Sequence, residues 1–107
     1  METAVQRRGG DCLVSIVGRI TIDSSPDLRI LLLQRLGTAD CESLTVDFYE
    51  VAYVDTSGLA VLLEVLRAAR RLNKTFHLSG LRERPRYVLE ATRLLRLFDE
   101  VSRDVRQ

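Results

Sequence analysis

The stretch VAYVDTSGLAVLLEVLRAAR, residues 51–70, constrains the fold more than any other part of the chain. An apolar, strand-like run ends in Asp-Thr-Ser-Gly, and a helical pattern begins at once. A helix starting at Asp55 or Thr56 turns by about 100° per residue, which gathers one broad apolar face. That face consists of Leu59, Leu62, Val65, Leu66, Ala69 and Leu72. The junction therefore predicts a strand that passes directly into a helix packed on the core.

The opposite side of this helix is predicted to be an exposed ridge. Its members recur at spacings of three and four residues: Ser57, Ala60, Glu64, Arg67 and Arg71. Asp55 and Thr56 can both satisfy free amides at the helix start, and Gly58 allows another backbone or a large partner to approach closely. From the residues alone, plain capping is the commoner explanation of such a junction. A functional interpretation needs a second source.

The rest of the chain alternates between strand and helix patterns. TAVQRR and CLVSIVGRI are rich in β-forming residues and flank GGD, which is typical of a hairpin turn. SSPDLRILLLQRLG predicts a helix with Ser25 as its cap, Pro26 at its first position and Gly37 at its end.

Two further strands and a last helix follow. SLTVDFYEV and KTFHLSGL have strand character, and RPRYVLEATRLLRLF starts at Pro85 and spaces Val88, Leu95 and Phe98 as a helix does. DEVSR closes the chain as a short strand or coil. We predict one α/β domain over residues 1–107: a mixed sheet of four to five strands with an N-terminal hairpin and helices packed against it.

Composition argues against several classes of partner. The 107 residues are 46% hydrophobic and carry 16 basic and 15 acidic side chains, for a net charge of +1. So balanced a charge would not attract nucleic acid or anionic lipid to the whole protein. The N-terminus lacks an apolar signal region, and no apolar run reaches the roughly 20 residues that span a bilayer. We expect a cytoplasmic protein without direct membrane insertion.

Catalytic and metal-binding patterns are weak. Cys12 and Cys41 are not in a metal-ligand spacing, and His77 alternates with Phe76 and Leu78 as a strand residue does. Ser57 is not in a G-x-S-x-G elbow. No phosphate-binding GxxxxGK[ST] loop is found. We expect no enzyme, no cofactor and no metal.

A family resemblance supplies the second source. VDFYEVAYVDTSGLAVLLEVLRAARRLNKTFHLSGL resembles the centre of a STAS domain, the sulfate-transporter and anti-sigma-factor-antagonist family, in which a strand leads to Asp-Ser/Thr-Ser-Gly-Leu and an amphipathic helix. VSIVGRI is similar to the second strand of the family, and LRERPRYVLEATRLLRLFDEV to its last helix. The resemblance covers almost the whole chain and implies the STAS, or SpoIIAA-like, fold.

The resemblance also implies a function, that of a bacterial anti-sigma factor antagonist. In such proteins a partner serine kinase of the GHKL type, which is also the anti-sigma factor, phosphorylates the second hydroxyl of the motif. By position that residue is Ser57. The unphosphorylated form binds the kinase and releases the sigma factor, and a phosphatase resets the switch. Asp55 and Thr56 would hold the motif and be recognised by the kinase, Gly58 would permit close approach, and the docking face would include Ala60, Glu64, Arg67 and Arg71.

One departure from the family pattern concerns the β-strand before the first helix. Many antagonists have an acidic residue three positions after the glycine of this strand, which helps to present the phosphorylation site. In GRITID that position holds Thr21, and Asp23 follows two residues later. Either Asp23 takes over the role, or phosphorylation is slow, absent or made by an unusual kinase.

A second function class stays open. Some STAS domains are non-catalytic subunits of lipid-transport ATP-binding cassette complexes, stress-signalling assemblies or anion transporters, and a lipid-transporter subunit can carry a motif close to DTSGLA. A neighbouring gene for a serine kinase or phosphatase would favour the antagonist, and one for a transporter ATPase and permease the subunit. In either case we expect a monomer or a weak homodimer, because the leucine-dense first helix more readily covers the sheet than a partner.

Overall fold

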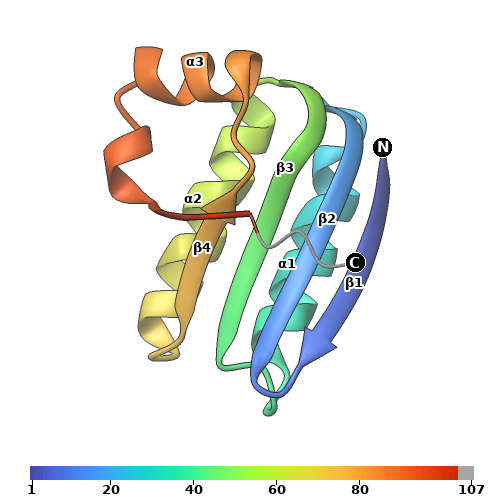
Figure 1. The fold of residues 1–107 in the computed structure, drawn as a ribbon, viewed down its shortest axis with the longest axis vertical. Helices are drawn as coiled ribbons and strands as arrows, with labels where there is room; N and C mark the ends of the chain where they lie inside the picture. Colours follow the sequence, from blue (N-terminus) through green and yellow to red (C-terminus); the bar gives the residue numbers. More distant parts are fainter. Residues whose placement is uncertain (104–107) are drawn as a thin grey trace.

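A computed structural model describes residues 1–103, and its elements alternate as the sequence indicates (Figure 1). The strands are β1 (Glu2–Arg8), β2 (Asp11–Ile20), β3 (Ser43–Val54), β4 (Thr75–Ser79) and β5 (Asp99–Val101). The helices are α1 (Ser25–Gly37), α2 (Thr56–Arg71) and α3 (Glu83–Ala91), followed by the short 3₁₀ helix η1 (Leu95–Leu97).

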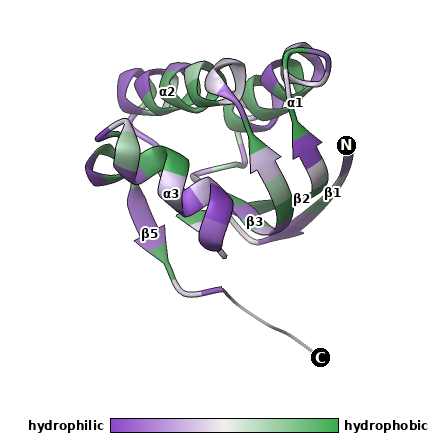
Figure 2. Cartoon of the chain, turned by 90° about the horizontal axis from the view of Figure 1, so that it is seen from above, coloured by the Kyte–Doolittle hydropathy of each residue, from purple (hydrophilic) through white to green (hydrophobic). Residues whose placement is uncertain are grey.

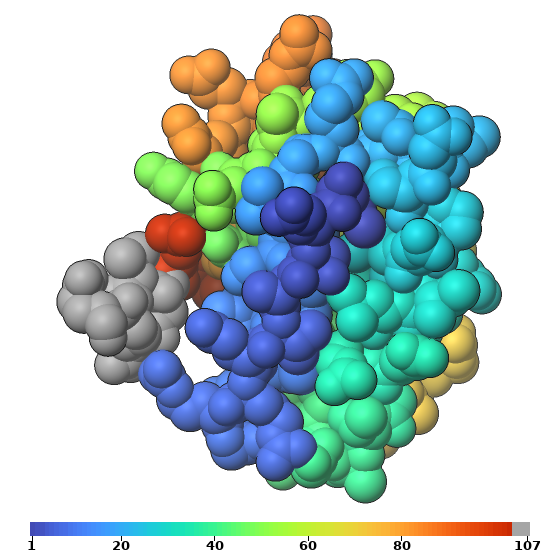
Figure 3. Space-filling model, turned by 90° about the vertical axis from the view of Figure 1, so that its right-hand side faces the viewer, coloured from blue at the N-terminus to red at the C-terminus, as the bar shows by residue number. Residues whose placement is uncertain are grey.

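The five strands form one mixed sheet in the order β1-β2-β3-β4-β5. β1 and β2 are antiparallel and joined by a tight turn, in which Gly9 has the positive φ of 63° that glycine adopts readily. The other neighbouring pairs are parallel. The predicted mixed sheet with an N-terminal hairpin is confirmed, and β1 lies at its edge, beside α1 when the molecule is seen from the side (Figure 3).

Helices α1 and α2 pack side by side on one face of the sheet (Figure 2). Alternate strand residues point toward them and are fully buried, among them Val14, Ile16, Val46 and Phe48. Leu28 and Leu32 of α1 and Leu62 and Val65 of α2 complete this layer of the core. The predicted apolar face of α2 is confirmed with one exception, since Leu72 lies beyond the last helical residue and is 49% exposed.

The start of α1 differs from the prediction. Ser24, and not Ser25, occupies the N-cap position, and its side chain caps no helix amide. The Ser24 hydroxyl instead accepts a hydrogen bond from the Thr21 amide (3.0 Å), within the turn that leads from β2 into the helix. Ser25 is thereby free to turn its side chain into the protein.

The last helix also differs from the prediction. It starts at Glu83 rather than Pro85, and it ends at Ala91 rather than continuing to Phe98. Arg93 has a left-handed φ of 61°, and the chain turns there into η1. This turn lets Phe98 reach the core, where its ring packs edge-on against Phe76 at a centroid distance of 6.2 Å. DEVSR supplies the short strand β5, as expected.

Candidate functional site

The site is built where two parallel strands end side by side. β2 and β3 are paired in register at Ile20 and Val54, and the Asp55 amide donates to the Ile20 carbonyl (3.0 Å). Because parallel strands finish at the same edge of a sheet, the starts of α1 and α2 lie next to each other there (Figure 1). Residues more than 30 positions apart in the sequence therefore meet.

Asp55 caps α2 and connects it to the loop between β2 and α1. Its Oδ1 atom accepts from the amides of Ser57 (2.9 Å) and Gly58 (3.3 Å), as an N-cap aspartate does. Its Oδ2 atom accepts from the Ile22 amide (3.1 Å). Thr56, predicted to share the capping role, is the first helical residue and is exposed, and these capping bonds all come from Asp55.

The Ser57 hydroxyl belongs to a chain of oxygen atoms. Ser57 Oγ donates to Asp55 Oδ1 (2.5 Å) and lies 2.7 Å from Ser25 Oγ. Ser25 Oγ in turn lies 2.8 Å from the Thr21 carbonyl oxygen. Ser57 is half-buried and Ser25 is only 4% exposed. The hydroxyl predicted to be open to solvent is therefore engaged on two sides.

These contacts lower the pKa of the Asp55 carboxyl. The hydrogen bond from the Ser57 hydroxyl is the largest cause, and the three backbone amides add to it. Partial burial acts in the opposite direction and is outweighed. Asp55 is therefore a carboxylate at neutral pH, with both oxygens accepting hydrogen bonds.

The loop before α1 brings the predicted residues Thr21 and Asp23 to the same edge. They flank Ile22, whose amide binds Asp55. Thr21 shapes the turn, because its carbonyl accepts from the amides of Ser24 (3.0 Å) and Ser25 (2.8 Å) and its hydroxyl accepts from the Asp23 amide (3.3 Å). The side chain of Asp23 is exposed, and its role in place of the acidic residue that Thr21 replaces stays a prediction.

The predicted ridge on α2 is mostly exposed. Ala60, Arg67 and Arg71 are exposed, whereas Glu64 is half-buried by a partner on α1. Arg29 binds Glu64 through two nitrogens, at 2.7 and 2.6 Å. This ion pair lowers the pKa of Glu64 and raises that of Arg29.

Gly58 allows a close approach, but the approaching atoms belong to the same chain. Gly58 is buried, and a Cβ atom there would lie 2.6 Å from Val54 Cγ2 and 2.8 Å from Ile20 Cγ2. Internal packing therefore accounts for this glycine. Its inclusion among the partner-binding residues stays a prediction.

Comparison with known proteins places this architecture in a family. A family model described as "Mlab, STAS domain" matches residues 3–99. The chain belongs to the STAS domain family. STAS domains are in general regulatory modules without catalytic activity. The STAS fold predicted from the sequence is thereby confirmed.

Several solved structures share the STAS fold at low sequence identity. An anti-sigma factor antagonist from Mycobacterium paratuberculosis is 20% identical, with a TM-score of 0.83 over 92% of this chain and 83% of the other. A candidate antagonist from Thermotoga maritima is 14% identical, with a TM-score of 0.86 over 96% and 87%. The Bacillus cell fate determinant SpoIIAA in its phosphorylated form is 12% identical, with a TM-score of 0.73 over 94% and 91%. At these identities the likeness concerns the fold.

Three residues of this site were not predicted from the sequence to belong to it: Ile22, Ser25 and Arg29. Ser25 had a signal, since the pair Ser24-Ser25 contains one hydroxyl more than a helix cap needs. Ile22 and Arg29 had none, because their partners Asp55 and Glu64 lie 33 and 35 residues away.

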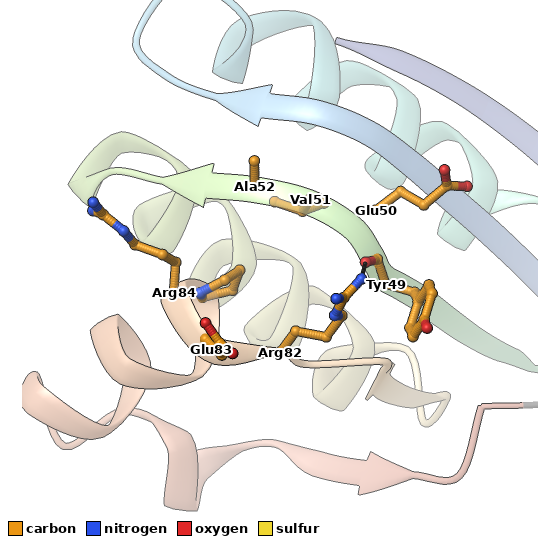
Figure 4. A pocket seen from close by; sticks show the side chains of 8 residues that line it. Tyr49, Glu50, Val51, Ala52, Arg82, Glu83 and Arg84 are labelled. Atoms are coloured by element: carbon orange, nitrogen blue, oxygen red, sulfur yellow. Dashed lines mark hydrogen bonds between the residues drawn. The ribbon is translucent and has the colours of Figure 1, made fainter.

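A depression lies away from this site, between β3 and the start of α3 (Figure 4). It has a volume of about 300 Å³ and mixed charge, with Glu50 and Glu83 beside Arg82 and Arg84. Arg82 lies over the Tyr49 ring at 4.6 Å and donates to the Tyr49 carbonyl (3.3 Å). The acidic and basic side chains around this depression therefore balance in charge, and Arg82 already interacts with Tyr49.

Residues 1–103 contain no group of three or more His, Cys, Asp or Glu side chains that could hold a metal ion. None of the helices in this range has the length and apolar character needed to cross a bilayer.

Proposed function

We propose that this STAS domain is an anti-sigma factor antagonist that is switched by phosphorylation of Ser57. The observation that carries the proposal is the Ser57 hydroxyl at the start of α2, hydrogen-bonded to the motif carboxylate Asp55 beside the exposed Thr56 and Ala60. The unphosphorylated form binds an anti-sigma factor serine kinase and releases the sigma factor. A phosphatase restores this form.

The covalent step is a phosphoryl transfer from a nucleoside triphosphate held by the kinase. Ser57 Oγ forms a bond to the γ-phosphorus, the bond from that phosphorus to the β–γ bridging oxygen breaks, and the diphosphate leaves. The hydroxyl proton passes to a base or to solvent. The product carries about −1.5 to −2 charges where a neutral hydroxyl was.

This charge would act on the partner rather than on the fold. A helix N-terminus tolerates an anion, because its free amides and dipole favour negative charge. SpoIIAA has the same fold in its phosphorylated form, which supports this expectation. A kinase surface that covers Ser57, Ala60 and the exposed Arg67 and Arg71 would instead have to bury or repel a dianion, at a cost of several kcal/mol unless the dianion is paired.

Intact-mass spectrometry of the protein from its own cells, with fragmentation, tests the proposal. We expect a mass gain of about 80 Da, the added HPO₃ group, located at Ser57 and absent from Ser57→Ala. Thr56→Ala is the comparison variant: it removes the neighbouring exposed hydroxyl, and any phosphate should still be located on Ser57, at a lower level because the kinase recognises Thr56. A phosphate that survives in Ser57→Ala, or that fragmentation of the wild type places on Thr56, would show that Ser57 is not the acceptor.

A second candidate is a non-catalytic subunit of a lipid-transport complex or a stress-signalling assembly. Two observations favour it: the matching family model is described as Mlab rather than as an antagonist, and the Ser57 hydroxyl already has hydrogen-bond partners without a phosphate. The subunit hypothesis predicts that Ser57 stays unmodified across growth and stress conditions and that the protein co-purifies with a transporter ATPase and permease.

A further inference from the structure

The oxygen chain at the start of α2 has fewer protons than contacts. Four oxygens are linked by three short contacts: Asp55 to Ser57 (2.5 Å), Ser57 to Ser25 (2.7 Å) and Ser25 to the Thr21 carbonyl (2.8 Å). The carboxylate and the carbonyl only accept, so the two serine hydroxyls supply just two protons. One of the three contacts must therefore lack a hydroxyl proton.

The surroundings of the acceptors indicate which contact lacks the proton. The Thr21 carbonyl already accepts from the backbone amides of Ser24 and Ser25 and from the Ser24 hydroxyl (3.3 Å), so its two lone pairs are satisfied without the Ser25 hydroxyl. Asp55 is charged, and a hydrogen bond to a carboxylate is stronger than one between neutral groups. Ser57 therefore donates to Asp55. Ser25 Oγ has two acceptors within reach, the Thr21 carbonyl (2.8 Å) and Ser57 Oγ (2.7 Å), and the lower occupancy of Ser57 Oγ assigns the Ser25 proton to it.

We propose that Ser25 is a positioning residue that holds the Ser57 hydroxyl inward against Asp55 and so slows its phosphorylation. The inference rests on the proposed function, since it concerns the same acceptor oxygen. Ser25 occupies one lone pair of Ser57 Oγ, and Asp55 takes its proton. The hydroxyl is thus fixed between two groups that a kinase must displace.

The inward position cannot hold the product. A phosphate on Ser57 Oγ would place its charge beside the Asp55 carboxylate, and like charges at this distance repel strongly. The side toward Ser25 is closed, because Ser25 is 4% exposed. Ser57 must therefore rotate outward about χ1 before or during transfer, and the hydrogen bond from Ser25 opposes that rotation.

Substitution of Ser25 by Ala tests the positioning without a kinase. Three-bond couplings in NMR report the χ1 populations of Ser57 in wild type and in Ser25→Ala. Because a neutral hydrogen bond contributes about 0.5–1.5 kcal/mol, we expect the outward rotamer to increase roughly two- to ten-fold relative to the inward one. The control is Ser24→Ala, which removes a hydroxyl that bonds the Thr21 carbonyl (3.3 Å) but contacts neither Ser25 Oγ nor Ser57 Oγ, and it should leave the Ser57 rotamer unchanged.

A second readout separates positioning from general loosening of the loop. Carbon-13 titration of the Asp55 carboxyl should show a higher pKa in Ser25→Ala, since Ser57 then spends less time donating to it. Ser25→Thr retains the hydroxyl and should restore the wild-type couplings and titration. Unchanged Ser57 couplings in Ser25→Ala, or equal changes in Ser24→Ala, would overturn the positioning role.

The rate effect is measured in the cells of origin, by mass spectrometry of Ser57 over time after a change in growth or stress. We expect the initial rate of phosphorylation to rise roughly two- to ten-fold in Ser25→Ala and to stay at the wild-type value in Ser24→Ala. A lower or equal rate in Ser25→Ala would refute the inhibition while leaving the antagonist proposal intact. If wild-type Ser57 is never phosphorylated, the proposed function fails, and the NMR couplings still decide whether Ser25 positions Ser57.

Discussion

Gly58→Ala should destabilise the domain although it places a better helix former in a helix. The added Cβ would lie 2.6 Å from Val54 Cγ2 and 2.8 Å from Ile20 Cγ2, distances that real Cβ contacts do not reach. Val54 is 1% exposed and Ile20 is 0% exposed. Both are β-branched residues at the ends of central strands, so their methyl groups cannot rotate away without moving β3 or β2.

The magnitude follows from two opposing terms. Forcing one methyl group into a packed core typically costs about 1–3 kcal/mol. Replacing glycine by alanine in a helix stabilises the helix by at most about 1 kcal/mol, and by less in the first turn, where Gly58 lies. We expect a net loss of about 1–2 kcal/mol, which lowers the Tm of a domain of this size by roughly 4–16 °C.

Urea and thermal unfolding monitored by circular dichroism measure this loss. Gly37→Ala is the matched control, because a Cβ there meets no atom within 4 Å, and it should leave stability unchanged or slightly higher. In a double-mutant cycle, Val54→Ala with Gly58→Ala should be less destabilising than the sum of the two single changes, since Val54→Ala removes the clashing methyl group. Equal midpoints for Gly58→Ala and wild type would refute the packing explanation.

Three further predictions follow from the site and the sheet. Asp55→Asn keeps a good N-cap oxygen but removes the negative charge at the helix start, and should cost about 0.3–1 kcal/mol at pH 7. Because the folded pKa of Asp55 is lowered, this contribution is present above the unfolded pKa of about 3.9 and is lost as the pH falls through the folded value. Urea unfolding at several pH values should therefore show the variant and wild type converging in acid, and a constant gap would contradict the assignment. Arg29→Ala should raise the pKa of Glu64 toward its ordinary value in an NMR titration, and an unchanged pKa would mean that the ion pair does not persist in solution. Gly80→Ala should lower the free energy of unfolding by at least about 2 kcal/mol, because the new side chain is strained at a φ of 68° and also clashes with Asp47 Oδ1. Gly9→Ala has a similar φ but open space around it, so it measures the strain alone. Equal losses of stability in the two variants would exclude the clash.

Most of the architecture could be predicted because its signals are local. One short segment of sequence is enough to recognise the hairpin turn, each strand pattern or the apolar face of α2. Helix α2 begins at Thr56, within the Asp-Thr-Ser-Gly motif, as predicted. The early end of α3 had no local signal. The segment TRLLRLF contains neither glycine nor proline, and Arg93 adopts its left-handed φ of 61° so that Phe98 can pack on Phe76.

The candidate site could be predicted only in part, for the same reason. Asp55 as a cap follows from its neighbours in the sequence, and so does the position of Ser57 in the first turn of α2. The contact between Ser57 and Ser25 depends on the parallel pairing of β2 and β3, which brings the starts of two helices together across 32 residues. The helical periodicity of α2 predicts that Ser57 lies on the exposed side. It contains no information about α1, whose Ser25 covers the Ser57 hydroxyl.

The distribution of donors around Asp55 explains how a switch at Ser57 could leave the fold unchanged. Asp55 accepts from four groups: the amides of Ile22, Ser57 and Gly58, and the hydroxyl of Ser57. Phosphorylation would remove only the hydroxyl proton, so the three amide bonds that cap α2 and hold the loop before α1 would remain. The effect of the phosphate would then be confined to the surface around Ser57, and Ser25 would set how readily that surface is reached.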